Sequence, residues 1–529
     1  MTRGRWLGLR LFVFFFCLYL LTMSGIIVSS DGNTMFLLTQ SIVDGKTLAI
    51  PYGNGYPGED GRLYPKAGIG QAVLSAPFYL LAKVVYGWSG LGEAESGYFL
   101  RFVTATVEPF MAALAVVLFL HVCLCLGFGT RVSLVLSAAF GLTTPLWVYS
   151  KSFLTEPFTT ALLLGSVLGL LAFKRSGRRR HLFLAGLCAA VTVLTKYSMV
   201  LAVGPIVVFF FGSCLPMKHR STELSVFSAA CRVLAFCTPL LACVAIALWY
   251  NHARFGNIFA SGYGAEISRE GFGTPLLVGI YGQLFSSGKS IFLYAPVLAL
   301  SWSGFSLFRR KLGAEALLFV SIFVINLLFY SKFVSWAGDG SWGPRYLVPF
   351  VPFLLVPVGS LLSSENVGRL LWSTFVFLAV VGLLVQIGGV SIYFGSYLRE
   401  IKEYPYKKEF TDPRFLSDSH FIPNFSPVWG HWKMLARNAS LHARGEFPDV
   451  PLVAYADAGS NRGAERRIPL DEGGRQELLK GLDFWFTYLL YVGKWKRVYW
   501  LAVALLGLCA ALSGWLSARR FFDRRLSSA

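Results

Sequence analysis

Charged residues are scarce in this sequence. Asp, Glu, Lys and Arg together make up 14% of its 529 residues, whereas hydrophobic residues make up 55%. A typical soluble domain contains about 25% charged residues, and the mean hydropathy here is +0.57. The composition therefore excludes an ordinary soluble domain and predicts a polytopic membrane protein.

Cysteine is absent from the long polar segments. All nine cysteines lie in or beside apolar runs, where Cys behaves mainly as a small hydrophobic residue. We therefore expect neither a disulfide framework nor a cysteine metal site. The histidines do not pair at a metal-ligand spacing either, so we expect no metal and no other cofactor.

Nucleotide motifs are also missing. The sequence has no Asp-x-Asp motif and no G-x-x-x-x-G-K-[ST] phosphate loop. The net charge of +20 does not indicate a nucleic-acid partner, because the basic residues cluster in short loops between apolar runs. That pattern is the positive-inside signal of a membrane protein.

Apolar runs of the length that a membrane span needs, about 20 residues, recur along the chain. They begin near Leu11, Ala72, Phe102, Val132, Phe158, Leu182, Met199, Ala230, Ile291, Ala314, Tyr346, Leu370 and Val498. Placing basic loops such as Lys174–Arg180 in the cytoplasm requires that one early run does not span. The run Ala72–Gly87 is short and contains Pro77 and Lys83, so we predict an interfacial or re-entrant helix there. About twelve spans remain, with both chain ends in the cytoplasm.

The predicted fold class is an all-α polytopic membrane protein in three parts. Residues 1–392 form the transmembrane module, and its first outer loop, 29–101, holds juxtamembrane helices. Residues 393–497 form a small extracytoplasmic region before the last span. Residues 498–529 hold that span and a basic cytoplasmic tail.

One carboxylate stands where the first predicted span ends. The apolar run from Leu11 to Val28 is followed by Asp31 and then by about forty polar, glycine-rich residues. A charge at a membrane surface, followed by a structured loop, suits an active site better than an anchor. Glu156 occupies a second outer corner, where the fourth span begins. The alternative for both is a carboxylate in headgroup water, which a helix N-terminus would also favour at Glu156.

Basic residues reach the same face. Arg345 stands at the outer end of a span after a glycine-rich turn, and its planar guanidinium suits phosphate oxygens. Lys66, Arg101 and Lys196 are further cations that the topology places there. The alternative for Arg345 and Lys196 is snorkelling of a long side chain to the interface. We expect Glu108, inside the second span, to have a structural partner such as Arg101.

A carboxylate with phosphate-binding cations indicates transfer of a group from a phosphate. No cytoplasmic loop is long enough to hold a nucleotide-sugar domain, and the outer face has no ready supply of nucleotide donors. A sugar used on that face would arrive attached to a membrane lipid. The residues therefore favour a transferase that uses a lipid phosphate.

With these features the sequence resembles the GT-C superfamily of membrane glycosyltransferases, and within it the bacterial relatives of protein O-mannosyltransferases and lipid A aminoarabinose transferases. The resemblance covers roughly Leu11–Pro357. It is carried by these stretches: Asp31-Gly32; Asp60-Gly61-Arg62-Leu63-Tyr64-Pro65-Lys66 with Gly68-Ile69-Gly70-Gln71 and Pro77-Phe78-Tyr79; Arg101; Tyr149 to Glu156; Gly186-Leu187 through Leu194-Thr195-Lys196; and Trp342-Gly343-Pro344-Arg345-Tyr346 with Pro349 and Pro352. Their order and shared membrane side make the combination more specific than any one piece.

The resemblance implies a GT-C-like bundle that moves a monosaccharide from a polyprenyl phosphate to a hydroxyl of a glycan, lipid or protein, with inversion at the anomeric carbon. Asp31 and Glu156 would be the catalytic residues. The remaining candidates would bind substrate, with the donor phosphate held by Arg345, Lys66, Arg101 and Lys196 and further contacts made by Tyr64, Tyr346 and His252. The single Asp31, where protein mannosyltransferases carry an acidic pair, speaks against a protein acceptor. The resemblance also implies a bacterial inner (plasma) membrane, with the site facing the periplasm or exterior.

Three other functions stay open. A lipid or sugar flippase or transporter would need charges at mid-membrane and broken helices in matched halves, and the sequence shows mainly charges at the outer ends of spans. A polysaccharide polymerase or ligase would keep its largest outer loop between mid-chain spans. A structural membrane subunit would need neither the first-loop carboxylate nor the Arg345 corner.

Overall fold

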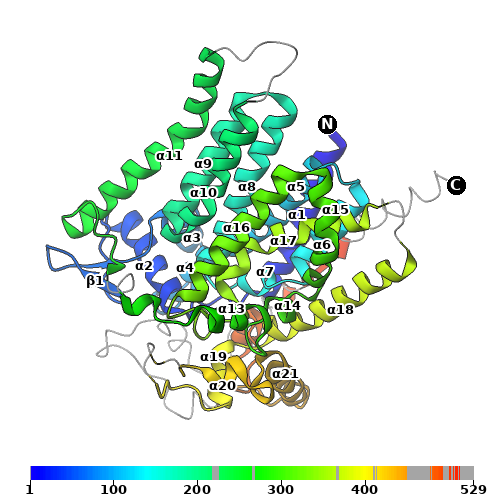
Figure 1. The fold of residues 1–529 in the computed structure, drawn as a ribbon. Coiled ribbons are helices and arrows are strands. Elements are labelled where there is room, and N and C mark those ends of the chain that lie inside the picture. The colour runs from blue at the N-terminus through cyan, green and yellow to red at the C-terminus, as the bar shows by residue number, and fades with distance from the viewer. Residues whose placement is uncertain are drawn as a thin grey trace.

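The computed structural model describes residues 2–216, 226–264, 269–364, 368–408, 412, 414–448, 477, 479–491 and several residues between 500 and 512. Within these residues the fold is almost entirely helical, as predicted, and the longer helices run side by side (Figure 1). The first part of the chain forms α1 (Thr2–Thr22), α2 (Ser30–Asp44), β1 (Gly55–Pro57), β2 (Leu63–Pro65), α3 (Gly70–Ser89), α4 (Glu93–Ala105), α5 (Val107–Cys125), α6 (Thr130–Leu142), α7 (Leu146–Tyr149), α8 (Thr155–Ser176), α9 (Arg179–Thr195), η1 (Tyr197–Met199), α10 (Val200–Phe209) and η2 (Phe210–Cys214).

The second part continues in the same way. It forms α11 (Val226–Phe255), η3 (Arg269–Phe272), α13 (Leu276–Phe285), α14 (Ile291–Tyr294), η4 (Pro296–Ala299), α15 (Leu300–Lys311), α16 (Gly313–Lys332), η5 (Arg345–Phe350), α17 (Val351–Leu362), α18 (Arg369–Ser391), α19 (Phe394–Glu400), α20 (Ser417–Phe421), η6 (Pro423–Phe425), α21 (Pro427–Ala443) and α24 (Trp485–Tyr491). Figure 1 shows α19, α20 and α21 gathered at the end of the bundle away from the N-terminus.

Seven helical segments in the described residues are long and apolar enough to cross a membrane. They are Ser96–Cys125, Thr155–Ser176, Tyr197–Cys214, Val226–Phe255, Gly313–Lys332, Arg345–Leu362 and Arg369–Ser391. Shorter apolar helices occupy Trp6–Thr22, Thr130–Leu142 and Leu276–Phe285. Each predicted span before Val498 overlaps a helix, but the spans predicted near Leu182 and Ile291 overlap α9 and the segment α14–α15, which belong to neither group. Most of the last predicted span lies outside the described residues. The chain is thus a multi-pass membrane protein, as predicted.

The centre of the bundle is packed through α5, α8 and α9. Side chains such as Phe119, Phe158 and Leu182 are fully buried there. Gly169 of α8 permits the close approach of α9, because a Cβ at that position would lie 2.8 Å from the Ala185 Cβ. Close packing of this kind, more than exclusion of water, holds helices together in a lipid environment.

The first outer segment contains more helix than its polar composition indicates. α1 ends at Thr22, although apolar residues continue to Val28. Gly25 breaks the helix with a φ of +72° and leaves no room for a Cβ beside Trp485. α2 then begins at once, at Ser30, within the loop 29–101 where juxtamembrane helices were predicted. The juxtamembrane helix predicted over Ala72–Gly87 is present as α3, and a short β1–β2 hairpin, which was not predicted, precedes it.

The described part of the region before the last span packs against the bundle. The Trp432 indole N–H donates to the Leu384 carbonyl of α18 at 3.1 Å, and the Trp485 amide donates to the Met23 carbonyl at 2.9 Å. Lys151 forms an ion pair with Asp483 at 2.7 Å. These contacts hold the described residues of 393–448 and 479–491 against the bundle, while residues 449–476, within the same predicted region, lie outside the described residues.

Candidate active site

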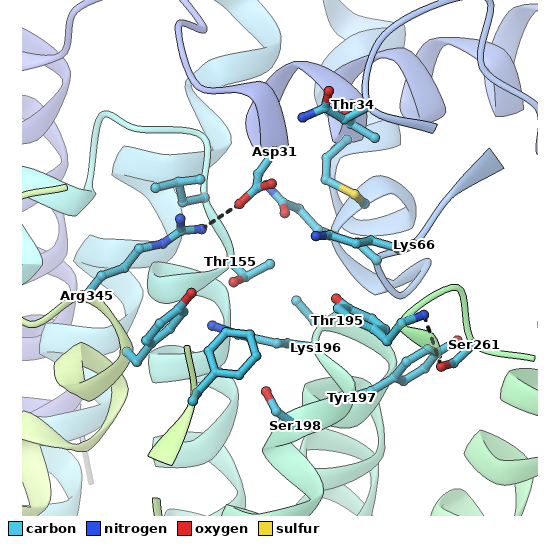
Figure 2. A pocket seen from close by; sticks show the side chains of 18 of the residues that line it. Asp31, Thr34, Lys66, Thr155, Thr195, Lys196, Tyr197, Ser198, Ser261 and Arg345 are labelled. Carbon is cyan, nitrogen blue, oxygen red and sulfur yellow. Dashed lines mark hydrogen bonds and ion pairs between the residues drawn. The ribbon is translucent and has the colours of Figure 1, made fainter. Parts of the chain in front are cut away.

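A cavity of about 490 Å³ lies among α2, the segment that leads into α3, the end of α9, α16 and η5 (Figure 2). Its polar lining comes from residues far apart in the sequence, among them Asp31, Thr34, Lys66, Gln71, Lys196 and Arg345. Aromatic side chains also line the cavity, among them Phe272, Phe329, Tyr330, Phe333 and Tyr346. Four residues that were predicted to lie on one membrane face thus line one cavity together with Tyr346. They are Asp31, Lys66, Lys196 and Arg345.

An ion network borders the cavity. Arg345 donates from Nη2 to Asp31 Oδ2 and from Nε to Glu156 Oε1, each at 3.1 Å, and Figure 2 shows the first of these contacts. Lys196 Nζ lies 3.4 Å from the same Glu156 oxygen. The Asp31 side chain is 50% exposed, whereas that of Glu156 is 1% exposed. Glu156 therefore pairs with Arg345 and Lys196 from the buried side, and Asp31 faces the cavity.

The start of α2 fixes the position of Asp31. The Ser29 hydroxyl caps the helix by accepting the Gly32 amide at 3.0 Å, and a negative charge in the first turn is favoured by the helix dipole. Gly32 lies tight against the neighbouring corner, because a Cβ there would be 2.9 Å from the Phe153 carbonyl oxygen. The carboxylate is thus carried by a capped helix packed on its neighbour.

Burial raises the pKa of Asp31, but the nearby charges of Arg345, Lys66 and Lys196 outweigh burial and lower that pKa below its ordinary value. Asp31 is therefore ionised at neutral pH. A carboxylate held by cations is a weak base, since general-base efficiency grows with proton affinity. Its basicity would rise if another anion took Arg345 from it.

A tight turn at Gly343 positions Arg345 at the cavity. Gly343 has a φ of +61°, and a Cβ there would lie 2.8 Å from an aromatic ring. The buried Lys289 donates from Nζ to the carbonyls of Asp339 at 3.0 Å and Ser341 at 2.6 Å. Burial lowers the pKa of Lys289 to about 7. The buried Lys289 amine thus stabilises the turn that leads into η5 through these two hydrogen bonds.

Two further cations are held at the cavity by different means. Lys66 follows β2, where the Pro65 carbonyl accepts a hydrogen bond from the buried Arg254. Lys196 follows α9 in an extended conformation. Its Nζ lies 4.7 Å from the centre of the Tyr346 ring, a favourable cation–π distance.

The aromatic lining forms a continuous wall that runs along membrane-spanning segments. Tyr346 stacks on Tyr330 with ring centres 4.4 Å apart. Phe333 lies 6.3 Å from Tyr346 and 5.8 Å from Phe272, and Phe272 lies 5.3 Å from Phe329. Because α16 and η5–α17 belong to candidate spans, this wall borders the region where a lipid chain would lie. Lys196 and Arg345 stand where the wall meets the ion network.

Three nominated residues are directed elsewhere in the structure. Arg101 donates to Asn33 at 2.5 Å and packs on the ring of Phe36. The Tyr64 hydroxyl donates to Asp60 at 2.8 Å, and His252 contacts the Gly256 carbonyl from the exposed end of α11. None of these three lines the cavity described here. Their predicted roles stay predictions.

The partner expected for Glu108 is not found in the described residues. Glu108 is fully buried in α5, and neither of its carboxyl oxygens has a hydrogen-bond partner there. The second oxygen of Glu156 is likewise without one. The described residues also contain no group of three or more His, Cys, Asp or Glu side chains that could hold a metal ion.

Sequence reasoning did not assign a role to several residues of the site. Thr34 lies three positions after Asp31 on α2, and Gln71 stands at the start of α3. A helix predicted from the Ser29 capping position would have brought Thr34 to the same face as Asp31, since residues three apart are neighbours on a helix. Lys289, which donates to the turn before Arg345, carries no such local signal.

No family model matches the chain, and no curated protein matches it. Among solved structures it is similar to ArnT from Cupriavidus metallidurans bound to undecaprenyl phosphate, with 14% identity and a TM-score of 0.44 over 95% of this chain and 76% of that one. The apo state of the same protein gives 14% identity and a TM-score of 0.45 over 96% and 78%. The oligosaccharyltransferase of Archaeoglobus fulgidus in the apo form gives 11% identity and a TM-score of 0.46 over 77% and 60%.

With TM-scores below 0.5 the likeness to these proteins is a loose one, and the roles of individual residues rest on the geometry of this chain alone.

Proposed function

We propose that this chain is an integral membrane glycosyltransferase that moves a monosaccharide from a polyprenyl phosphate to a hydroxyl acceptor on the extracytoplasmic face. The observation that carries the proposal is the meeting of Asp31, Lys66, Lys196 and Arg345 at one cavity with a continuous aromatic wall. The cations suit a phosphate, the aromatic wall suits an isoprenoid chain, and the carboxylate suits an acceptor hydroxyl.

In the proposed reaction Asp31 takes the proton of the acceptor hydroxyl while its oxygen bonds to the anomeric carbon. The bond from that carbon to the phosphate oxygen breaks on the opposite face, so the configuration inverts. The electron pair leaves with the polyprenyl phosphate, whose charge Arg345 and Lys66 stabilise. Glu156 acts through Arg345 and Lys196, which makes it a positioning residue in this scheme although the sequence nominated it as catalytic.

The ion pair between Arg345 and Asp31 supports an order of events. A donor phosphate that enters the cavity competes with Asp31 for the guanidinium, since both are anions. Once Arg345 turns to the phosphate, the pKa of Asp31 rises and the carboxylate becomes a better base. Donor binding would therefore prepare Asp31 for the acceptor.

The first test reconstitutes the wild type and Asp31→Asn in proteoliposomes with radiolabelled polyprenyl-phosphate monosaccharides. Asn keeps the size of the side chain and removes its ability to take a proton. We expect transfer by the wild type and a loss of about 10²–10⁴-fold in the variant, with donor binding retained. Asp44→Asn is the matched control, because Asp44 ends the same helix and pairs with Lys83 away from the cavity.

Two outcomes would contradict the proposal. Full transfer by Asp31→Asn would place the base elsewhere. Movement of labelled lipid across the bilayer without transfer to any acceptor would favour the flippase instead.

A further inference from the structure

Two buried polar atoms beside Asp31 have no hydrogen-bond partner within the described part of the chain. They are Thr34 Oγ1 and Gln71 Oε1. Thr34 is 5% exposed and Gln71 is 1% exposed, and both side chains line the cavity. A buried polar group left unpaired destabilises the folded chain, so unpaired groups in a cavity wall point to a ligand that pairs with them.

The orientation of Gln71 is fixed by its other amide atom. Nε2 donates to the Phe153 carbonyl at 3.2 Å. A carbonyl oxygen only accepts hydrogen bonds, so the amide cannot be turned around without losing that contact. Oε1 is therefore the atom left unpaired, and it requires a donor such as a hydroxyl group.

Thr34 differs from the other helical threonines in the use of its hydroxyl. Thr39, one turn further along α2, donates to the Met35 carbonyl at 2.8 Å. Thr104 and Thr160 do the same within their own helices. The Thr34 hydroxyl makes no such bond to the described residues, although a carbonyl four positions earlier is the usual partner. Figure 2 shows Thr34 on α2 close to Asp31 and on the same side of the cavity as Lys66.

The chemistry of these two side chains restricts what they can bind. Thr34 and Gln71 are neutral and match hydroxyl groups, which both donate and accept.

We infer that Thr34 and Gln71 form a subsite for hydroxyl groups of the donor monosaccharide. The inference rests on the proposed function. The phosphate is attached directly to the sugar, so groups next to the phosphate-binding cations face the donor's sugar. Gln71 follows Lys66 on the same short segment, and Thr34 follows Asp31 by one helical turn.

The test compares binding of two ligands without acceptor: bare polyprenyl phosphate and the same lipid carrying a hexose with free hydroxyls. Thr34→Val keeps the side-chain shape and breaks no hydrogen bond to the described residues. We expect it to weaken binding of the hexose lipid by about 3- to 10-fold and to leave binding of bare polyprenyl phosphate unchanged. Thr39→Val controls for the general cost of the substitution and should change neither affinity.

The inference is overturned if Thr34→Val lowers both affinities equally. Gln71→Met should act like Thr34→Val on the ratio of the two affinities, even if loss of the Phe153 contact lowers stability.

The failure of the proposed function would look different. The wild type would then bind neither bare polyprenyl phosphate nor the hexose lipid, and both inferences would fall. Binding of the bare lipid phosphate with no sugar discrimination would overturn the subsite alone.

Discussion

Two ion clusters include residues near the start of α8, and they differ in how completely their charges are paired. Lys151 pairs with Asp483 at 2.7 Å and also donates to the carbonyls of Val390 and Asp483. The other oxygen of Asp483 accepts the Tyr488 hydroxyl at 2.7 Å. Five residues after Lys151, Glu156 pairs with Arg345 and Lys196 but leaves one carboxyl oxygen unpaired among the described residues.

Exposure separates the two clusters further. The side chains of Lys151 and Asp483 are 7% and 5% exposed, so that every ion of this pair is enclosed. The other cluster, which we call the open cluster, consists of Asp31, Glu156, Lys196 and Arg345. Its Asp31 side chain is half exposed and faces the cavity. A buried ion pair whose hydrogen-bonding atoms are all paired stabilises a fold or fixes one arrangement of it. A cluster with an unpaired oxygen and one exposed carboxylate is suited to receive a ligand.

The largest effect should come from opening the enclosed pair. Lys151→Met leaves the Asp483 carboxylate buried without its cation, and breaking one side of a buried pair typically costs about 3–5 kcal/mol. We expect a loss of that size in the free energy of unfolding, measured by denaturation in detergent micelles. The double variant Lys151→Met with Asp483→Asn should recover much of the loss, because the amide is neutral and still accepts from Tyr488. A cost below about 1 kcal/mol for the single variant would mean that Asp483 is not enclosed.

The second-largest effect should come from Arg345→Gln, which should lower transfer activity more than stability. Arg345→Gln removes the guanidinium from the open cluster, where removal of one charge-stabilising donor typically costs about 10²–10³-fold in rate. We expect a loss of that order in transfer and weaker binding of bare polyprenyl phosphate. The free energy of unfolding should fall less than in Lys151→Met, because Glu156 keeps Lys196 and Asp31 is open to water. A larger loss of stability than of transfer would make Arg345 a structural residue.

The third prediction concerns the pH dependence of the open cluster. The pKa of Asp31 is lowered because nearby cations outweigh burial, so kcat/KM of the wild type should fall only below pH 3.8, the ordinary value. Arg345→Gln removes the first of these cations and should move that acidic limb to higher pH. The comparison needs kcat/KM, which reports the free enzyme. An unchanged limb would show that Arg345 does not control the base.

Local sequence patterns were sufficient to predict the helices and the ions of the open cluster. Apolar runs located the spans, and charges at their outer ends identified Asp31, Glu156 and Arg345 before any contact was known. Juxtamembrane helices were predicted in the first outer loop, but the bounds of α2 were not, although the Ser29 cap with an acid in the first turn marks its start.

The enclosed pair could not have been predicted in this way. Lys151 and Asp483 are more than three hundred residues apart, and neither stands in a pattern that indicates its partner. The same holds for the hydrogen bond that Arg101 donates to the Asn33 side-chain oxygen of α2. Side-chain partners of this kind depend on tertiary packing, which a single sequence does not contain.

The smallest effect should come from Lys289, which is fully buried yet serves the open cluster. Burial is the main cause that lowers its pKa from 10.5 to about 7, with Arg345 acting in the same direction and Asp339 and Glu403 opposing it. Between these values the unfolded chain binds a proton that the folded chain does not. The contribution of Lys289 to the free energy of unfolding therefore rises with pH from about 7 to 10.5.

Lys289→Met removes this titration along with two hydrogen bonds to the turn before Arg345. We expect donor KM to rise by about 3- to 10-fold, since each lost hydrogen bond is worth about 0.5–1.5 kcal/mol and acts only through the position of Arg345. Melting temperatures of both proteins, measured in detergent from pH 7 to 10, isolate the titration because other groups cancel in the difference. The gap between the curves should widen in favour of the wild type as pH rises. Parallel curves would mean that Lys289 stays protonated throughout, held by the Asp339 and Ser341 carbonyls, and would place it with the enclosed ions.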